Sequence, residues 1–142
     1  MFEYFPGNYV WNLGVVATLN SGGLIDEVDR ACRPIKEAAT RGEDAGTPDF
    51  LRAWTGLTDQ LVGQAEQAAN AGHTRTAGQL YARAAHYLCQ AERMLSNSDP
   101  HRIPTYRRVL DLAKKAFDLP YVSSFIADWV ADTFAELAQR TG

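Results

Sequence analysis

Residues 65–85 read AEQAANAGHTRTAGQLYARAA, and this stretch decides the fold class. Apolar residues recur at spacings of three and four before and after Gly72, which is typical of two helices joined by a tight turn. Small alanine residues on the facing sides let the two helices approach closely. The stretch therefore predicts a helical hairpin with the rhythm of a helical repeat. A solenoid needs at least about three such units, so a single hairpin favours a bundle.

Both helices of the hairpin extend outward from this turn. The first is expected to start at Thr47, a capping residue that is followed by a proline and an acid suited to the first helical turn. The second runs from about residue 74 to residue 95 and ends before the turn SNSDP at 96–100. Their predicted inner faces consist of Leu51, Trp54, Leu57, Leu61, Ala65 and Ala68 in the first helix, and Ala77, Leu80, Tyr81, Ala84, Leu88, Ala91 and Leu95 in the second.

Helical spacing also marks the segments 7–20, 24–41, 104–118 and 122–140, while GEDAG at 42–46 is a loop. Pro34 lies inside the second of these segments, so we expect a kink or a break near Arg33. The sequence as a whole predicts an all-α bundle of about six helices. The predicted inner faces of these segments are Val10, Leu13, Val16 and Ala17; Ile25, Val28, Cys32, Ile35 and Ala39; Val109, Leu110, Ala113 and Phe117; and Phe125, Ile126, Trp129, Val130 and Phe134.

The length and charge of the chain exclude several classes of protein. Its 142 residues suit one globular domain, and 14 basic against 17 acidic residues leave a net charge of −3. A nucleic-acid binder needs a basic face, so we expect no nucleic-acid partner. The hydrophobic share of 46% and the charged share of 22% are those of a folded protein rather than a disordered one.

Hydropathy and cysteine content indicate the compartment. No apolar run approaches the roughly 18 residues that a membrane helix needs, so we expect no membrane partner. The N-terminal run MFEYFPGNYVWN has no positive charge ahead of its apolar residues and no small-residue cleavage site, unlike a signal peptide. Cys32 and Cys89 fall in separate helical segments and do not form a disulfide framework. We therefore expect free thiols and a cytoplasmic protein.

The common catalytic and cofactor motifs do not occur in the sequence. No serine has glycine at both second neighbours, as a nucleophile elbow requires, and Gly22-Gly23 lacks the pattern of a phosphate loop. The spacings Cys-x-x-Cys, His-Glu-x-x-His and Glu-x-x-His are also missing, which leaves a zinc or di-iron site unsupported. We expect no metal, no cofactor and no catalytic triad in these residues.

One polar group stands out on the second helix of the hairpin, where Arg83, His86, Tyr87 and Gln90 share one face. In one interpretation, His86 is a proton shuttle or a hydrogen-bond donor to a ligand, oriented by Tyr87 or Arg83. In the other, it is a partly exposed histidine among surface neighbours, which the lack of a defined partner favours. His86 and Cys89 together supply two metal ligands, too few for a site.

Aromatic residues crowd the first eleven positions, and acidic residues open the next segment. The aromatic residues are Phe2, Tyr4, Phe5, Tyr9 and Trp11. They either line an apolar ligand pocket or staple the N-terminal chain onto the bundle, whereas Trp54 and Trp129 lie on predicted core stripes. For Asp26, Glu27 and Asp29 in the run IDEVDR, we expect a solvated first helical turn that is favoured by the helix dipole.

Five runs of sequence carry a resemblance to a known family and together span residues 2–118. They are FEYFPGNYVWN, the Gly22-Gly23 turn, FLRAW, AGHTRTAGQLYARAAHYLCQAERM and IPTYRRVLDLAKKAF. These runs resemble the N-terminal helical region of the α/β-hydrolase family that includes 2,6-dihydroxypseudooxynicotine hydrolase, the Ayg-type polyketide-shortening hydrolases and FrsA-like proteins. In that family the region is a cap over the catalytic core, and the implied activity is hydrolysis of a C–C bond next to a carbonyl, or of an ester.

The C-terminal run YVSSFIADWVADTFAEL resembles the closing helix of the same family, which follows the catalytic histidine. The resemblance thus implies a cap-like region at 1–118 joined to a closing helix at 119–142, with the core's serine, acid and histidine missing between them. Such a chain is inactive without an α/β-hydrolase core, in the same or a separate chain, and covers an aromatic or polyketide substrate. The candidate substrate-binding residues of the pocket wall are Tyr4, Tyr9, Trp11, Trp54, His86 and Tyr87.

A function from another class remains open, namely a stand-alone interaction module whose TPR-like hairpin holds a partner peptide. A cap without its core should expose an apolar patch and either form homodimers or bind that core. An autonomous module should instead be polar outside its groove. A third possibility, an enzyme that uses His86 and Tyr87, requires activity from these residues alone.

Overall fold

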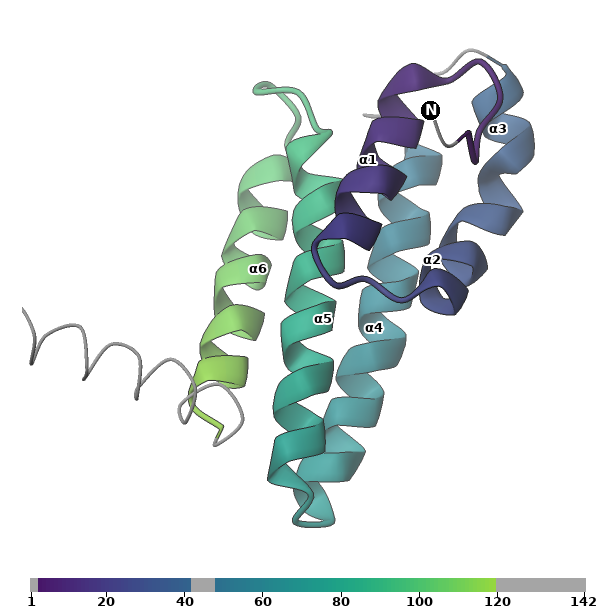
Figure 1. Cartoon of the computed structure of the whole chain (residues 1–142). Helices are drawn as coiled ribbons and strands as arrows, with labels where there is room; N and C mark the ends of the chain where they lie inside the picture. The colour runs from purple at the N-terminus through teal and green to yellow at the C-terminus, as the bar shows by residue number, and fades with distance from the viewer. Residues whose placement is uncertain (1–2, 42–47, 120–142) are drawn as a thin grey trace, which may run out of the picture.

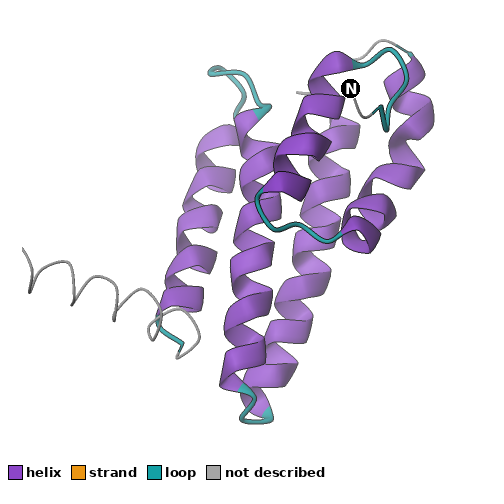
Figure 2. Cartoon of the chain, in the orientation of Figure 1, coloured by secondary structure: helices purple, strands orange, loops and turns teal. Residues whose placement is uncertain are grey.

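The computed structural model describes residues 3–41 and 48–119. Every regular element in these two ranges is a helix, and neither range contains a strand (Figure 2). The all-α class predicted from the sequence is therefore confirmed for this part of the chain. The predicted segment 122–140, with Trp129, and the predicted loop at 42–46 lie outside the described residues. In chain order the helices are α1 (Tyr9–Asn20), α2 (Ile25–Cys32), the 3-10 helix η1 (Arg33–Ile35), α3 (Lys36–Thr40), α4 (Pro48–Asn70), α5 (Thr74–Arg93) and α6 (Arg102–Phe117).

Helices α4 and α5 form the predicted hairpin, and α6 lies along α5 on the side away from α2 (Figure 1). Gly72 closes the hairpin with φ at +79°, a left-handed conformation that glycine adopts without strain. Alanine faces the neighbouring helix at Ala65, Ala77 and Ala84, whose side chains are fully buried. Close approach of the two helices therefore follows from small residues at their contact.

Helix α2 breaks where Pro34 requires it. The chain changes to the 3-10 helix η1 at Arg33–Ile35 and resumes an α-helical path in α3. Pro34 has no backbone N–H and clashes with the preceding turn, so an uninterrupted α-helix is unfavourable there. The break expected near Arg33 is confirmed. It lets both α2 and η1 pack against α4 (Figure 1).

The predicted inner face of α1 is wrong. Val10 and Leu13 are 41% and 46% exposed, and the buried face carries Trp11, Val15 and Thr18 instead. Almost every position of this helix is apolar or small, so periodicity alone does not distinguish its two faces. The Asn8 side chain caps the start of this helix by accepting a hydrogen bond from the backbone N–H of Trp11 at 3.0 Å.

Asn12 fixes the N-terminal chain against the same face of α1. Its Oδ1 accepts hydrogen bonds from the backbone N–H groups of Tyr4 and Phe5, each at 2.8 Å, and its Nδ2 donates to the Phe5 carbonyl at 2.7 Å. Asn12 is 2% exposed, and these bonds satisfy the amide inside the protein. The loop ahead of α1 is therefore anchored, and it carries the Phe5 ring into the core.

The predicted inner face of α6 is also wrong in part. Leu110 and Phe117 point outward, while Leu112 and Ala116 are the buried residues of this helix. Apolar residues occur on two sides of α6, and the periodic pattern does not show which side meets α5. The prediction that Ile25 belongs to the inner face of α2 is also wrong, because this residue lies exposed at the first turn of the helix.

No helix in the described ranges combines the length and the apolar character that crossing a membrane requires.

Candidate functional site

Three of the four polar residues that share a face of α5 have polar partners on two other helices. Arg83 and Tyr87 contact Glu27 of α2, whereas His86 lies near the end of α1, with its Nε2 3.4 Å from the Thr18 carbonyl oxygen. Gln90 is almost completely buried. The structure thus joins Arg83 and Tyr87 into one polar cluster around Glu27, and His86 makes no hydrogen bond to Glu27 among the contacts of the described residues.

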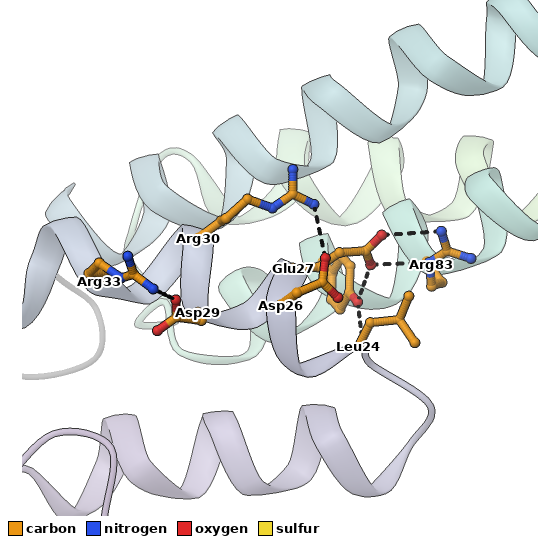
Figure 3. Close-up of polar contacts among 8 residues, drawn as sticks. Leu24, Asp26, Glu27, Asp29, Arg30, Arg33 and Arg83 are labelled. Carbon is orange, nitrogen blue, oxygen red and sulfur yellow. Dashed lines mark hydrogen bonds and ion pairs between the residues drawn. The ribbon is translucent and has the colours of Figure 1, made fainter.

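The centre of this polar cluster is the carboxylate of Glu27, which is only 5% exposed (Figure 3). The Tyr87 hydroxyl donates to Glu27 Oε2 at 2.5 Å, and the Arg83 guanidinium donates to Oε2 at 3.1 Å and to Oε1 at 3.2 Å. The Tyr87 oxygen also accepts the backbone N–H of Leu24 at 2.9 Å. We call Leu24, Glu27, Arg83 and Tyr87 the α2–α5 cluster.

The expectation of a solvated acidic turn at 25–30 is wrong for Glu27 and holds for Asp26, which is exposed and paired with Arg30 at 3.7 Å (Figure 3). Glu27 lies next to Val28 on the side of α2 that faces the core. A buried carboxylate needs a cation and hydrogen-bond donors. Arg83 and Tyr87 meet this need, because residues four apart share one face of α5. Sequence reasoning noticed the pair but missed its partner.

The chemistry of the α2–α5 cluster is that of a structural clamp. Burial and the hydrogen bond to Glu27 raise the pKa of Tyr87 well above its usual value, so its hydroxyl keeps its proton at neutral pH. That proton is already donated to Glu27, and the Tyr87 oxygen is occupied by the Leu24 N–H. Neither group is left free to transfer a proton to a ligand. The cluster therefore holds the start of α2 on α5.

The aromatic residues form a continuous row through the described core. Neighbouring ring centroids are separated by 5.0–6.0 Å from Tyr4 to His86. Edge-to-face and tilted contacts of this kind stabilise a core beyond the area that they bury. From each ring to the next one that it contacts, the row consists of Tyr4, Phe5, Trp11, Phe50, Trp54, Tyr87 and His86.

Tyr4 secures the outer end of this row. Its hydroxyl donates to Asp29 Oδ1 at 2.5 Å, and Lys36 Nζ lies 4.2 Å from the centre of its ring. Partial burial and the hydrogen bond to Asp29 raise the pKa of Tyr4 above its usual range. These contacts correspond to the stapling interpretation of the N-terminal aromatic residues, and they tie the segment ahead of α1 to α2 and α3.

The six predicted substrate-binding residues differ in what can reach them. Trp11, Trp54 and Tyr87 are buried in the core, whereas Tyr4 and His86 are half-buried. Tyr9 is 63% exposed and lines a pocket of about 460 Å³ with Glu3, Gly7 and Asn12. Contact with a substrate stays a prediction for all six, and Tyr9 is the most exposed of them.

Two other surface pockets flank α4 and contain none of the six predicted residues. One of about 490 Å³ lies between α2–η1 and α4, and Arg30, Ile35 and Arg52 contribute to its lining. The other, of about 600 Å³, lies between α4 and the turn before α6, where Leu51 and His101 are part of its wall. Sequence reasoning gave no signal for either pocket.

The two cysteines are free thiols in the structure. Burial raises the pKa of Cys32 to about 12, and burial also raises the pKa of Cys89. A thiol with a raised pKa holds little thiolate at neutral pH and is a weak nucleophile. Within residues 3–41 and 48–119, no three His, Cys, Asp or Glu side chains are grouped closely enough to hold a metal ion.

Comparison of the chain with protein-family models, with curated proteins and with solved structures gives no match. The resemblance of residues 2–118 to a hydrolase cap therefore stays a prediction from the sequence.

Proposed function

We propose that this chain is the helical cap portion of a serine-type α/β-hydrolase. In this proposal it is a bundle of about six helices with a repeat-like hairpin, and it covers a catalytic core that belongs to the same or a separate chain. The core supplies the nucleophile and the oxyanion hole, while the cap supplies pocket walls and excludes water. The substrate class is aromatic or polyketide, with the cleaved C–C bond or ester next to a carbonyl.

The observation that supports this proposal is the outer face of α1, which we define as Tyr9, Val10 and Leu13. These side chains are 63%, 41% and 46% exposed, although the opposite face of the same helix is buried in the core. A helix that is apolar on all sides is normally buried on all sides. Leu24 and Ile25 add exposed apolar side chains just beyond the end of α1.

An exposed apolar face of this kind fits a cap better than an autonomous interaction module. Surface patches of contiguous apolar side chains mark sites where another protein body packs. Tyr9 connects this face to the pocket that it lines with Glu3, Gly7 and Asn12, so a core docked on α1 would close that pocket. The free thiols of Cys32 and Cys89 suit a reducing compartment, which supports a cytoplasmic location.

The test is binding of the full chain to the catalytic core of 2,6-dihydroxypseudooxynicotine hydrolase from which the helical cap has been deleted. Isothermal titration should show a 1:1 complex, and hydrolysis of an aryl ester should appear or change only in the complex. The double variant Val10→Asp/Leu13→Asp should weaken binding at least tenfold, because it places two charges on the docking face. In the complex, His86→Ala should change turnover or substrate preference, and unchanged kinetics would make His86 a bystander.

The matched control is Gln64→Asp/Gln67→Asp, which introduces the same charges at the same spacing on the exposed side of α4. This variant should bind the core as the unaltered chain does. A monomeric chain that ignores the core and binds extended peptides along the hairpin would replace the cap proposal with the interaction module. A homodimer that the Val10→Asp/Leu13→Asp variant dissociates would show that a second copy covers α1 instead.

A further inference from the structure

Helix α6 lies on the other side of α5 from α1 (Figure 1) and carries a second exposed apolar face. Four large side chains on it are 47–57% exposed. Their spacings of three, four and seven residues place them on one narrow stripe of the helix. We call this set the α6 stripe, and it consists of Ile103, Tyr106, Leu110 and Phe117.

The α6 stripe is distinct from the side of α6 that packs on α5. That packed side carries Leu112 and Ala116, both of which are buried. The stripe runs from Ile103 to Phe117, so it is about 21 Å long at 1.5 Å per residue. An apolar stripe of this length and narrow width matches one amphipathic helix rather than a broad protein surface.

The charge of α6 restricts what can cover its stripe. The helix contains five basic residues and one acidic residue, Asp111, which give it a formal net charge of +4. Carboxylates outside the helix pair with three of the basic residues, Arg102, Arg108 and Lys114, so Arg107 and Lys115 contribute most of the charge that remains. A second copy of the chain would place two such helices side by side, and like charges in contact oppose association. A negatively charged helix is therefore the better occupant. The basic residues are Arg102, Arg107, Arg108, Lys114 and Lys115.

We propose that residues 122–140 of the same chain cover the α6 stripe as an antiparallel helix. This segment starts within a few residues of Leu119, where the described part of α6 and its following turn end. Its helical pattern places Phe125, Ile126 and Trp129 among its apolar positions. At 1.5 Å per residue a helix of this length spans about 28 Å, enough to cover the stripe.

Charge complementarity supports this occupant. Residues 120–142 contain Asp128, Asp132 and Glu136 at intervals of four, against the single basic residue Arg140, so their net charge is −2. Acids at such intervals share one side of a helix and can face the basic residues of α6. The short connection through Pro120 also gives the segment an effective concentration in the millimolar range. This docking is independent of the proposed function, which uses the outer face of α1.

The full chain contains a built-in reporter for this contact. Trp11 and Trp54 are fully buried, so quenching of tryptophan fluorescence by acrylamide reports mainly on Trp129. In the unaltered chain, docking should make the quenching constant at least threefold lower than that of free N-acetyltryptophanamide. The variant Leu110→Asp/Phe117→Asp should raise it at least twofold, because two charges on the stripe release the segment. Both Leu110 and Phe117 are about half exposed, so the rest of the fold should tolerate the change.

Two further variants keep the result decisive. Val10→Asp/Leu13→Asp alters the other exposed face and should leave Trp129 quenching unchanged, which separates this proposal from the cap proposal. Asp128→Asn/Asp132→Asn removes two charges without touching the described fold, and it should also raise quenching. The proposal is overturned if Trp129 in the unaltered chain is quenched as readily as the free compound. It is equally overturned if protection appears only with a dimer in analytical ultracentrifugation, because a second copy would then cover the stripe.

Discussion

Helix α5 contacts α2 and α6 through two different kinds of interface. On the α2 side, Glu27 is buried with Arg83 and Tyr87 at hydrogen-bond distance. On the α6 side, Leu112 and Ala116 pack into the hairpin, and Lys115 lies 5.4 Å from the centre of the Tyr81 ring. Hydrogen-bonded geometry makes the first contact specific in register, whereas apolar packing can be satisfied by more than one orientation of α6. The position of α2 is thus more tightly specified than that of α6.

The variant Glu27→Ala should lower the unfolding free energy the most, because it removes the polar contact between α2 and α5. It leaves the Arg83 guanidinium and the Tyr87 hydroxyl without their shared acceptor, and losing one member of a buried ion pair costs about 3 kcal/mol of unfolding free energy. Urea unfolding followed by circular dichroism measures the change. Asp26→Ala is the matched control on the exposed side of the same turn, where the loss should stay below about 0.5 kcal/mol. Equal losses would mean that Glu27 is not buried.

The variant Leu112→Ala should weaken the packing of α6 on α5, because it leaves a cavity there rather than an unpaired charge. Leu112 is 4% exposed, and removing a buried leucine side chain costs about 2.5 kcal/mol. The same urea experiment should show a smaller loss for Leu110→Ala, since Leu110 is half exposed on the described helices and loses only its proposed contact with residues 122–140. In the Asp128→Asn/Asp132→Asn background, where residues 122–140 are released from the stripe, a larger loss for Leu110 than for Leu112 would mean that α6 presents the opposite side to α5.

The variant Tyr87→Phe separates the hydrogen bonds of the α2–α5 cluster from ring packing, because it keeps the ring in the aromatic row and removes only the hydroxyl. Leu24 N–H then loses its acceptor and Glu27 loses one donor, which together should cost about 1.5 kcal/mol. Tyr106→Phe removes an exposed hydroxyl from α6 and should change the unfolding free energy by less than about 0.3 kcal/mol. Indistinguishable unfolding curves for the two variants would contradict the hydrogen bonds of the α2–α5 cluster.

The pH dependence of stability should reveal the same cluster with the smallest signal. The pKa of Tyr87 is raised in the folded state, so near pH 10 and above the unfolded chain loses this proton while the folded chain keeps it. The unfolding free energy should therefore be unaffected by this group below pH 9 and should fall as the pH rises above about 10. Urea midpoints at pH 8 to 11 should decline less steeply in Tyr87→Phe than in Tyr106→Phe. Equal slopes of urea midpoint against pH in the two variants would exclude a contribution of Tyr87 to the pH dependence of stability.

Much of the fold could be predicted because its signals are local. The turn at Gly72 and the break at Pro34 each depend on the conformational preference of one residue, and both occur where the sequence predicts them. The faces of α1 and α6 could not be predicted, because each helix is apolar on more than one side. Which side is buried depends on contacts with segments that are distant in sequence.

The candidate site could likewise be predicted only where its residues are close together in the sequence. Arg83 and Tyr87 could be grouped from their spacing of four residues, but Glu27 lies more than fifty positions away and matches a solvated helix turn by composition. A usable signal was present, since Glu27 adjoins Val28 and precedes Ala31 by one helical turn, which are both buried positions of α2. An acid on an apolar stripe requires a buried partner.

Local sequence signals suffice for the helical class of residues 3–41 and 48–119, for the hairpin and for the break at Pro34, because backbone preferences and helical periodicity act over a few residues. Three features depend instead on how the helices pack together: the burial of Glu27, the aromatic row that joins Trp11 to Trp54, and the outward direction of apolar faces on α1 and α6. Burial is a property of the whole packing arrangement. The free energy gained by covering one side of a helix depends on what the rest of the chain brings against it.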